Sequence, residues 1–294
     1  MAQTQMALDS LDFDATVALA TKVAPHVDIL EIGTPCIKHN GIELLKTLRA
    51  KFPNNKILVD LKTMDAGFYE AEPFYKAGAD ICTVLGTADI GTIKGVIDVA
   101  NKYGKMAQVD LINVADKKAR TLEVAKLGAH IIGVHTGLDQ QAAGQTPFAD
   151  LALITGLNTG AKVSVAGGVK AATVRQVVDA GADIVVAGAA IYGAADPAAS
   201  AAEITGLARA NSASAGGMGK YLPWALIAGA VLLGLYLLTG NKPAEEKTAE
   251  TPAVEEAMPA AETPMEAAPE EVAPIEAAPV ESAPAADAAP TAKE

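Results

Sequence analysis

Ala-Gly-Ala-Asp-Ile at residues 77–81 decides the fold, because it recurs as Leu-Gly-Ala-His-Ile at residues 127–131 and as Ala-Gly-Ala-Asp-Ile at residues 180–184. Each copy places a glycine between a segment rich in helix formers and a run of β-branched residues. Glycine adopts the left-handed conformation that closes a helix at little steric cost. The repeat therefore predicts three junctions at which a helix ends and a strand begins.

Short apolar runs alternate with longer stretches of Ala, Leu, Lys and Glu on both sides of these junctions, which is the pattern of repeated βα units on a parallel sheet. Eight runs are apolar enough to be covered on both faces. They span residues 3–8, 27–32, 56–61, 80–85, 106–111, 130–134, 162–166 and 183–187. Eight units within about 210 residues predict a small (β/α)8 barrel. A doubly wound open sheet is the alternative, but no Gly-x-Gly-x-x-Gly turn follows the first run to support it.

The charge of the chain is concentrated at its carboxyl end. The 294 residues include 35 acidic and 23 basic ones, of which residues 241–294 hold 13 and 3. The net charge of −12 is thus −10 in this tail and −2 in the rest, a balance that argues against a nucleic-acid binder. Cys36 and Cys82 are the only cysteines, so we expect neither a disulfide framework nor a zinc site. The first residues lack the basic and apolar regions of a signal peptide, which predicts a cytoplasmic barrel.

Three further segments follow the predicted barrel. Residues 211–220 have the composition of a flexible linker. Residues 221–239 are predicted to form a transmembrane helix, because the uncharged run at 222–238 is long enough to cross a hydrocarbon core and has aromatic residues near its ends. A buried helix of a soluble domain is the alternative. Residues 240–294 are rich in Ala, Pro and Glu and are predicted to be a disordered acidic tail.

Polar side chains gather where the predicted strands end, which is where the chemistry of such barrels is located. They are Asp9, Glu31, Asp60, Lys62, Asp65, Asp110 and His135. Carboxylates held close together raise one another's pKa unless a cation compensates them. Because Glu31 and Asp60 lie on neighbouring strands and offer hard oxygen ligands, we expect them to bind Mg²⁺ that keeps several waters, with Mn²⁺ as an alternative ion. The alternative for any single one of these residues is a purely structural role as a hydrogen-bonding group.

Glycines follow the last two predicted strands. Gly167 and Gly168 come after the seventh, and Gly188 and Ala189 come after the eighth. Backbone N–H groups can approach an anion closely at such positions, and barrels commonly hold a phosphate there. We therefore predict a phosphate-binding site from these four residues; ordinary turns are the alternative.

Several motifs together resemble a known family. Residues 60–65 (DLKTMD) match the Asp-x-Lys-x-x-Asp signature of the orotidine monophosphate decarboxylase suprafamily. Within it, residues 1–210 resemble the 3-hexulose-6-phosphate synthases, and the resemblance says nothing about residues 211–294. The stretches that carry it are residues 7–9 (ALD), 30–35 (LEIGTP), 108–114 (QVDLINV), 134–139 (VHTGLD) and 187–191 (AGAAI).

The resemblance implies the aldol condensation of formaldehyde with D-ribulose 5-phosphate to give D-arabino-hex-3-ulose 6-phosphate. In this reaction Mg²⁺ on Glu31 and Asp60 would stabilise the charge of an enediolate. Lys62 would donate to the same oxygens. His135 would act as the base that removes the C1 proton, its alternative being a packing or capping histidine. Asp110 would orient or share that proton transfer.

The resemblance also implies a homodimer, in which Asp65 serves the partner's active site. Asp9 and Asp139 would bind or orient sugar hydroxyls. Since phosphorylated sugars are cytosolic, the prediction places the barrel in the cytoplasm, anchored to the membrane through residues 221–239, with the tail on the opposite side.

Two other functions compete with this one. A 3-keto-L-gulonate 6-phosphate decarboxylase would share most of the predicted site, but it has arginines where this chain has Leu138 and Ala189. An alkyl group cannot replace the charge and fork geometry of arginine, so the synthase is favoured. The second alternative is that the barrel is a catalytically silent head of a membrane-organising protein. The presence of the full set of acidic residues, lysine and histidine argues against it.

Overall fold

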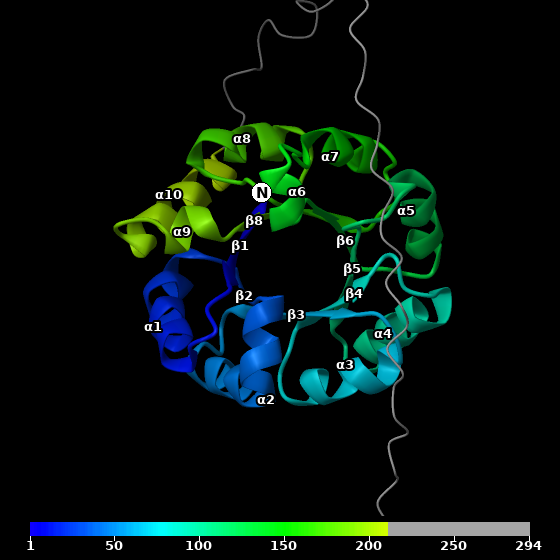
Figure 1. The fold of residues 1–294 in the computed structure, drawn as a ribbon, viewed down its shortest axis with the longest axis horizontal. Coiled ribbons are helices and arrows are strands. Elements are labelled where there is room, and N and C mark those ends of the chain that lie inside the picture. The colour runs from blue at the N-terminus through cyan, green and yellow to red at the C-terminus, as the bar shows by residue number, and fades with distance from the viewer. Residues whose placement is uncertain (211–294) are drawn as a thin grey trace, which may run out of the picture. The chain divides into compact units, whose positions relative to one another are not determined.

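The computed structural model describes residues 1–210, in which eight strands alternate with helices around a closed ring (Figure 1). The strands are β1 (Gln3–Leu8), β2 (Ile29–Ile32), β3 (Lys56–Thr63), β4 (Ile81–Leu85), β5 (Met106–Asp110), β6 (Ile131–His135), β7 (Lys162–Ala166) and β8 (Ile184–Ala187). Every neighbouring pair is parallel, and β8 pairs with β1 to close the barrel. The (β/α)8 prediction is therefore confirmed, and the open-sheet alternative is wrong.

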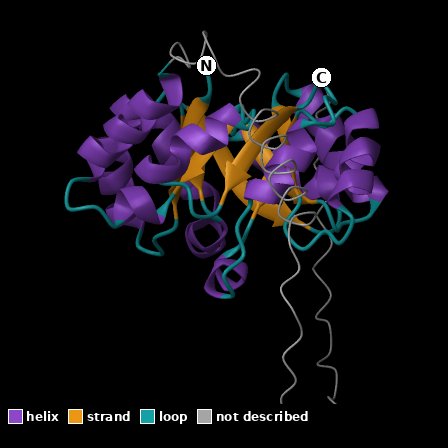
Figure 2. Ribbon diagram, turned by 90° about the horizontal axis from the view of Figure 1, so that it is seen from above, coloured by secondary structure: helices purple, strands orange, loops and turns teal. Residues whose placement is uncertain are grey.

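Helices cover the outside of the strands, as the side view shows (Figure 2). They are α1 (Phe13–Val23), the 3-10 helix η1 (Ala24–His26), α2 (Thr34–Lys51), α3 (Gly67–Lys76), α4 (Ile90–Lys102), α5 (Lys117–Lys126), α6 (Leu138–Ala142), α7 (Phe148–Thr155), α8 (Ala171–Asp179), α9 (Ala189–Tyr192) and α10 (Pro197–Arg209). Aspartates begin several of them. Asp12 accepts a hydrogen bond from the Ala15 amide at 2.7 Å, and Asp116 accepts one from the Ala119 amide at 2.9 Å, which satisfies donors that the first turn leaves free.

The predicted glycine junctions are confirmed. Gly78, Gly128 and Gly181 have φ of +109°, +89° and +95°, and each follows the end of a helix. A side chain at these positions would be strained, which is why glycine recurs there. The three copies of the motif thus mark equivalent corners of the barrel.

The buried apolar residues form two separate clusters. The larger lies between strands and helices and includes Leu30, Val59 and Val109. The smaller consists of residues that point to the opposite face of the strands, into the barrel: Ile29, Leu58, Ile81, Ile131, Ile184 and Val186. Successive residues of a strand alternate between its faces. Side chains two residues beyond this inner cluster, such as Glu31 and Asp60, therefore also belong to the inner face and lie closer to the carboxyl ends of the strands.

The edges of several predicted strands are wrong by one or two residues. Asp28, Asp80, His130 and Asp183 were expected within strands or at their starts, but they precede β2, β4, β6 and β8. Their side chains accept hydrogen bonds from the backbone of the preceding strand instead. The third strand is longer than expected and continues through Lys62 to Thr63.

The predictions for residues 211–220, 221–239 and 240–294 lie outside the described residues. Within residues 1–210, no helix has the length and apolar character needed to cross a membrane.

Candidate active site

Asp60 lies at the centre of the polar cluster at the carboxyl end of the strands. Its side chain is buried on the inner face of β3. Its Oδ1 accepts a hydrogen bond from Thr83 Oγ1 at 2.7 Å, and its Oδ2 accepts one from Thr34 Oγ1 at 2.6 Å. The same Oδ2 pairs with the ammonium group of Lys62. Both oxygens of this carboxylate are thus held in place by neighbouring strands and helices.

Lys62 reaches Asp60 because β3 bulges at this point. The register between β3 and β4 shifts between Val59 and Thr63, and Lys62 has a φ of +46°, unusual for a residue with a side chain. Its Nζ also lies 3.6 Å from Asp110 Oδ2 and 3.1 Å from Thr34 Oγ1. Burial by itself lowers the pKa of Lys62, but the carboxylates of Asp60 and Asp110 outweigh it and raise the pKa above the ordinary value. Lys62 is therefore a fixed positive charge.

Asp110 and His135 form an oriented pair at the ends of β5 and β6. His135 Nδ1 lies 2.8 Å from Asp110 Oδ2, and Asp110 Oδ1 accepts a hydrogen bond from the Ile112 amide at 2.9 Å. Burial acts to raise the pKa of Asp110, but the bond to His135 and its charge hold that pKa below the ordinary value. Burial likewise acts to lower the pKa of His135, and Asp110 reverses the effect and raises it.

The charge state of Asp110 determines which nitrogen of His135 carries hydrogen. An ionised carboxylate can only accept hydrogen bonds, so the hydrogen lies on Nδ1 of His135. In the neutral imidazole the lone pair then belongs to Nε2. His135 is 24% exposed at its side chain, and this leaves a base available at the barrel mouth.

Glu31 is buried on the inner face of β2 with little positive charge around it. Gln5 Nε2 donates to Glu31 Oε2 at 2.7 Å. Burial, followed by the charge of Asp60, raises the pKa of Glu31 to about 8. A carboxyl group in this position is costly to ionise unless a cation accompanies it. A divalent cation on the oxygens of Glu31 and Asp60 would supply that charge, so the two residues fit the predicted magnesium site.

The predicted magnesium site has two protein ligands, Glu31 and Asp60. Among residues 1–210, no group of three His, Cys, Asp or Glu side chains is placed to hold a metal ion. Mg²⁺ binds proteins through one or two carboxylates and keeps several waters, so two ligands meet its requirement. A zinc or calcium site would need more.

Asp9 belongs to the same cluster and is accommodated by the glycine at position 33. Burial and the charge of Asp60 raise the pKa of Asp9. A Cβ at Gly33 would collide with Asp9 Oδ1, and a Cβ at Gly188 would lie 3.5 Å from Asp9 Oδ2. Gly33 therefore makes room for the Asp9 carboxylate, whereas a Cβ at Gly188, predicted to contact phosphate, would only touch it.

The remaining predicted phosphate residues lie at the ends of β7 and β8. Gly167 and Gly168 have φ of +107° and +72°, and a Cβ at Gly167 would press against the Thr136 carbonyl. Gly188 and Ala189 begin the short helix α9. These residues are placed at the expected end of the barrel, and their binding of phosphate stays a prediction.

Two predicted site residues lie apart from the cluster. Asp65 is exposed in the loop after β3, and its Oδ1 accepts a hydrogen bond from the Ala66 amide at 2.7 Å. Asp139 is exposed in the first turn of α6. The structure brings together Asp9, Glu31, Asp60, Lys62, Asp110 and His135, but not these two.

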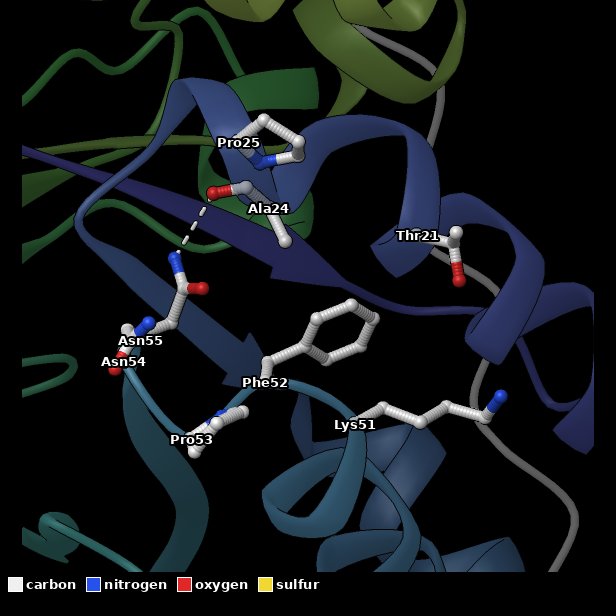
Figure 3. Close-up of a pocket in the computed structure, with 8 residues that line it drawn as sticks. All are labelled: Thr21, Ala24, Pro25, Lys51, Phe52, Pro53, Asn54 and Asn55. Carbon is white, nitrogen blue, oxygen red and sulfur yellow. Dashed lines mark hydrogen bonds between the residues drawn. The ribbon is translucent and has the colours of Figure 1, made fainter.

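The sequence reasoning missed Gln5, Thr34 and Thr83, which hold Glu31 and Asp60 in place. Thr83 is the only polar residue of β4 and lies two residues after the inward-facing Ile81, a pattern that could have identified it. Gln5 gives no such signal, because Gln3 and Thr4 are also polar residues of β1. A surface pocket of about 380 Å³ lies at the opposite end of the barrel, before β2 and β3, where Asn55 bonds to the Ala24 carbonyl (Figure 3). None of the predicted site residues lines it.

The comparisons with known proteins agree on one family. The profile described as "Orotidine 5'-phosphate decarboxylase / HUMPS family" matches residues 2–204. The 3-hexulose-6-phosphate synthase of Methylomonas aminofaciens is 88% identical over 209 residues, which are 71% of this chain and 100% of that protein. The 3-hexulose-6-phosphate synthase of Mycobacterium gastri is 48% identical over 202 residues, 68% of this chain and 96% of that one.

Solved structures show the same likeness. The crystal structure of 3-hexulose-6-phosphate synthase from Salmonella typhimurium has 40% identity and a TM-score of 0.69, and covers 70% of this chain and 98% of its own. That of 3-keto-L-gulonate-6-phosphate decarboxylase from Vibrio cholerae has 26% identity and a TM-score of 0.64, covering 70% and 97%. The likeness to the synthase is the stronger of the two in sequence.

Proposed function

The chain belongs to the orotidine 5'-phosphate decarboxylase / HUMPS family, its barrel is an aldehyde-lyase of the 3-hexulose-6-phosphate synthase type, and we propose how the residues at its mouth perform that reaction. The reaction joins formaldehyde to D-ribulose 5-phosphate and yields D-arabino-hex-3-ulose 6-phosphate. One observation supports the assignment of roles most directly. The Asp60–Lys62 pair and the Asp110–His135 pair share one mouth, with Lys62 in contact with both.

His135 removes the C1 proton of the sugar phosphate. Its Nε2 carries the lone pair because Nδ1 donates to Asp110. The electron pair left on C1 attacks the carbon of formaldehyde and forms the new carbon–carbon bond. The aldehyde oxygen then takes a proton from the imidazolium of His135 and becomes a hydroxyl group, which returns the histidine to its neutral state. Asp110 keeps the ring in one orientation throughout.

Lys62 supplies a permanent positive charge beside the reacting oxygens. It stays protonated because Asp60 and Asp110 outweigh its burial. A donor fixed before the reaction stabilises developing negative charge without reorganising. Glu31 and Asp60 would hold Mg²⁺, which when bound contributes Lewis-acid stabilisation of negative charge on substrate oxygens.

The other predicted residues bind the rest of the substrate. Asp9, next to Gly188, would accept hydrogen bonds from sugar hydroxyls. The backbone N–H groups of Gly167 and Gly168 would bind the phosphate. Asp65 and Asp139 are exposed and lie outside the cluster. We assign Asp65 to the active site of a second copy of the chain in a homodimer, and Asp139 to the sugar.

The test is turnover by the purified full chain with Mg²⁺, D-ribulose 5-phosphate and formaldehyde. Formaldehyde should disappear as the six-carbon ketose phosphate forms, and Lys62→Ala should abolish most of this. A chain that consumes no formaldehyde under these conditions would support the silent-head alternative. Release of CO₂ from 3-keto-L-gulonate 6-phosphate would support the decarboxylase alternative, which the absence of arginine at Leu138 and Ala189 disfavours.

A further inference from the structure

The buried hydroxyl group of Thr83 connects the two functional residues of β3. Thr83 lies on the inner face of β4 and is 1% exposed. Its Oγ1 accepts a hydrogen bond from the backbone N–H of Lys62 at 2.9 Å. The same oxygen donates to Oδ1 of Asp60 at 2.7 Å. An amide can only donate and a carboxylate can only accept, so the direction of both bonds follows.

The bulge in β3 explains why a side chain is needed at this point. Val59 pairs with Cys82 and Thr63 pairs with Val84, so residues 60–62 of β3 all face the single residue Thr83 of β4. Extra residues at a bulge lose their ladder hydrogen bonds. The Lys62 amide is such a donor, and Lys62 also holds a left-handed φ of +46°. A buried donor without a partner is costly, and the Thr83 hydroxyl replaces the missing ladder acceptor.

The second bond of the hydroxyl reaches the catalytic face. By donating to Asp60 Oδ1, Thr83 fixes the rotation of the carboxylate whose other oxygen meets Lys62 Nζ and Thr34. The backbone of Lys62 and the side chain of Asp60 are thereby tied to one atom of a neighbouring strand. Neither residue can turn without breaking a buried hydrogen bond.

We propose that Thr83 is a positioning residue that locks the β3 bulge and the Asp60 carboxylate together, and so sets where Asp60 and Lys62 stand in the barrel mouth. The proposal rests on the proposed function for its catalytic meaning. Thr83 is buried and does not itself touch the substrate. Its effect is transmitted through the two groups that it holds.

The chain offers a matched control for testing this role. Thr83→Val keeps the size and β-branched shape of the side chain and removes only the hydroxyl. Thr83→Ser keeps the hydroxyl and removes a methyl group. Thr63, on the neighbouring strand and also 1% exposed, has an Oγ1 without a hydrogen-bond partner in the described structure. Thr63→Val therefore makes the same chemical change without removing a hydrogen bond.

Two measurements on the full chain test the proposal. The first is steady-state turnover of formaldehyde and ribulose 5-phosphate, and Thr83→Val should lower kcat/KM by about 10- to 100-fold because a hydrogen bond to a charged group is lost. Thr83→Ser should recover most of this loss, and Thr63→Val should match the wild type. The second is hydrogen exchange at the Lys62 amide, measured by mass spectrometry with fragmentation on the metal-free chain without substrate. Exchange should be accelerated in Thr83→Val alone, by roughly tenfold or more.

The outcomes separate this role from the function on which it rests. A wild-type chain without turnover would overturn the proposed function. Normal turnover in the wild type, together with equal losses in Thr83→Val and Thr83→Ser, would overturn the positioning role, because the hydroxyl would then be unimportant. Equal losses in Thr83→Val and Thr63→Val would do the same, as would slow exchange of the Lys62 amide in Thr83→Val.

Discussion

His135 Nδ1 lies 2.8 Å from Asp110 Oδ2, and this contact joins the last residue of β6 to the last residue of β5. The register pairs Asp110 with Gly133, two residues before His135. His135 and Gly133 lie on the same face of β6, and a side chain at Gly133 would press on the Gln108 side chain beside Asp110. The contact between His135 and Asp110, and with it the geometry of the proposed base, therefore follows from the register of the two strands.

Replacing Asp110 by Asn should move the acid limb of the pH–activity profile. In the native chain Asp110 raises the pKa of His135 above its ordinary value, against the effect of burial. The proposed base must be neutral, so activity should be lost as the pH falls through this raised pKa. Without the carboxylate the pKa of His135 should fall, and the acid limb should shift to lower pH. The maximal kcat/KM should also fall, by roughly 10²-fold, because the ring loses its orientation.

The measurement is kcat/KM of formaldehyde consumption between acid and neutral pH for both proteins. Asp98→Asn is the matched control, because within residues 1–210 Asp98 forms only an exposed pair with Lys94 on α4. Its profile should overlay that of the native chain. An acid limb that stays in place in Asp110→Asn would show that His135 is not the titrating base.

Glu31→Gln should weaken Mg²⁺ binding and turnover together. The amide preserves the size of the side chain, and its oxygen can still accept from Gln5 Nε2, so the fold should persist. Removing the negative charge should lower the affinity for Mg²⁺ by about 100-fold, as expected for a ligand with few protein partners. Calorimetric titration of the metal-free chain with Mg²⁺ gives the affinity, and turnover at increasing Mg²⁺ gives the functional dependence.

Glu43→Gln serves as the control for this experiment. Glu43 is exposed on α2 and, in the part of the chain that the structure describes, pairs only with Lys46, so both the Mg²⁺ affinity and the turnover of this variant should match those of the native chain. Chelation of the metal should stop the native enzyme, and added Mg²⁺ or Mn²⁺ should restore it. If Glu31→Gln leaves the Mg²⁺ dependence unchanged, Glu31 is not a ligand.

The fold and the site differ in how far the sequence could predict them. Eight strands and their closure follow from apolar runs and from Gly78, Gly128 and Gly181, since both signals are local. The grouping of Asp60, Lys62, Asp110 and His135 also follows, because the carboxyl ends of barrel strands meet at one face. These features needed only periodicity and topology.

The bulge in β3 and the residues that support the site could not be predicted in this way. The left-handed φ of Lys62 depends on a register shift between β3 and β4, which no local pattern encodes. Thr83 is recognisable as the one polar residue of β4, but only the structure shows what its hydroxyl contacts. Asp65 shares a motif with Asp60 and Lys62, yet the bulge and the loop after β3 carry it out of the cluster to an exposed position.

Mixing two inactive variants should restore activity if Asp65 serves a partner's site. Asp65→Ala and His135→Ala should each be inactive alone. In a homodimer assembled from equal amounts of both, half of the dimers are mixed, and each mixed dimer has one site with both native residues. About a quarter of native activity should therefore return after joint refolding or co-expression.

The pair Lys62→Ala with His135→Ala is the matched control. Both residues contact Asp110 within one barrel, so each site of a mixed dimer lacks one of them, and no activity should return. Equal recovery in both mixtures would argue against subunit complementation. No recovery in either would place Asp65 in the site of its own barrel or outside the chemistry.

At the end of the barrel opposite the site, one kind of hydrogen bond recurs four times, and one of its four acceptors is a histidine where the others are aspartates. The residue before each even-numbered strand accepts a hydrogen bond from the backbone of the preceding odd-numbered strand. The pairs are Asp28 with the Thr4 amide at 2.9 Å, Asp80 with the Ile57 amide at 2.9 Å, Asp183 with the Val163 amide at 2.8 Å, and His130 Nδ1 with the Ala107 amide at 3.2 Å. Three of these acceptors are carboxylates, and only His130 loses its acceptor on protonation.

The stability of the barrel should therefore depend on pH through His130. As an acceptor, Nδ1 must be unprotonated, and Nε2 then donates to Asn101 Oδ1 at 3.1 Å. Burial lowers the pKa of His130, so the unfolded chain takes up the proton at higher pH than the folded one. The stabilisation is complete above the ordinary histidine pKa of about 6.5 and is lost as the pH falls from there toward the lower pKa of the folded chain.

His130→Asn offers an oxygen acceptor that does not titrate, so the urea midpoint of this variant should fall less than that of the native chain between pH 8 and about pH 5.5. Replacing the exposed His39 on α2 by Asn should leave the native pH dependence in place, whereas an unchanged pH dependence in His130→Asn would show that the hydrogen bond to Ala107 does not respond to protonation.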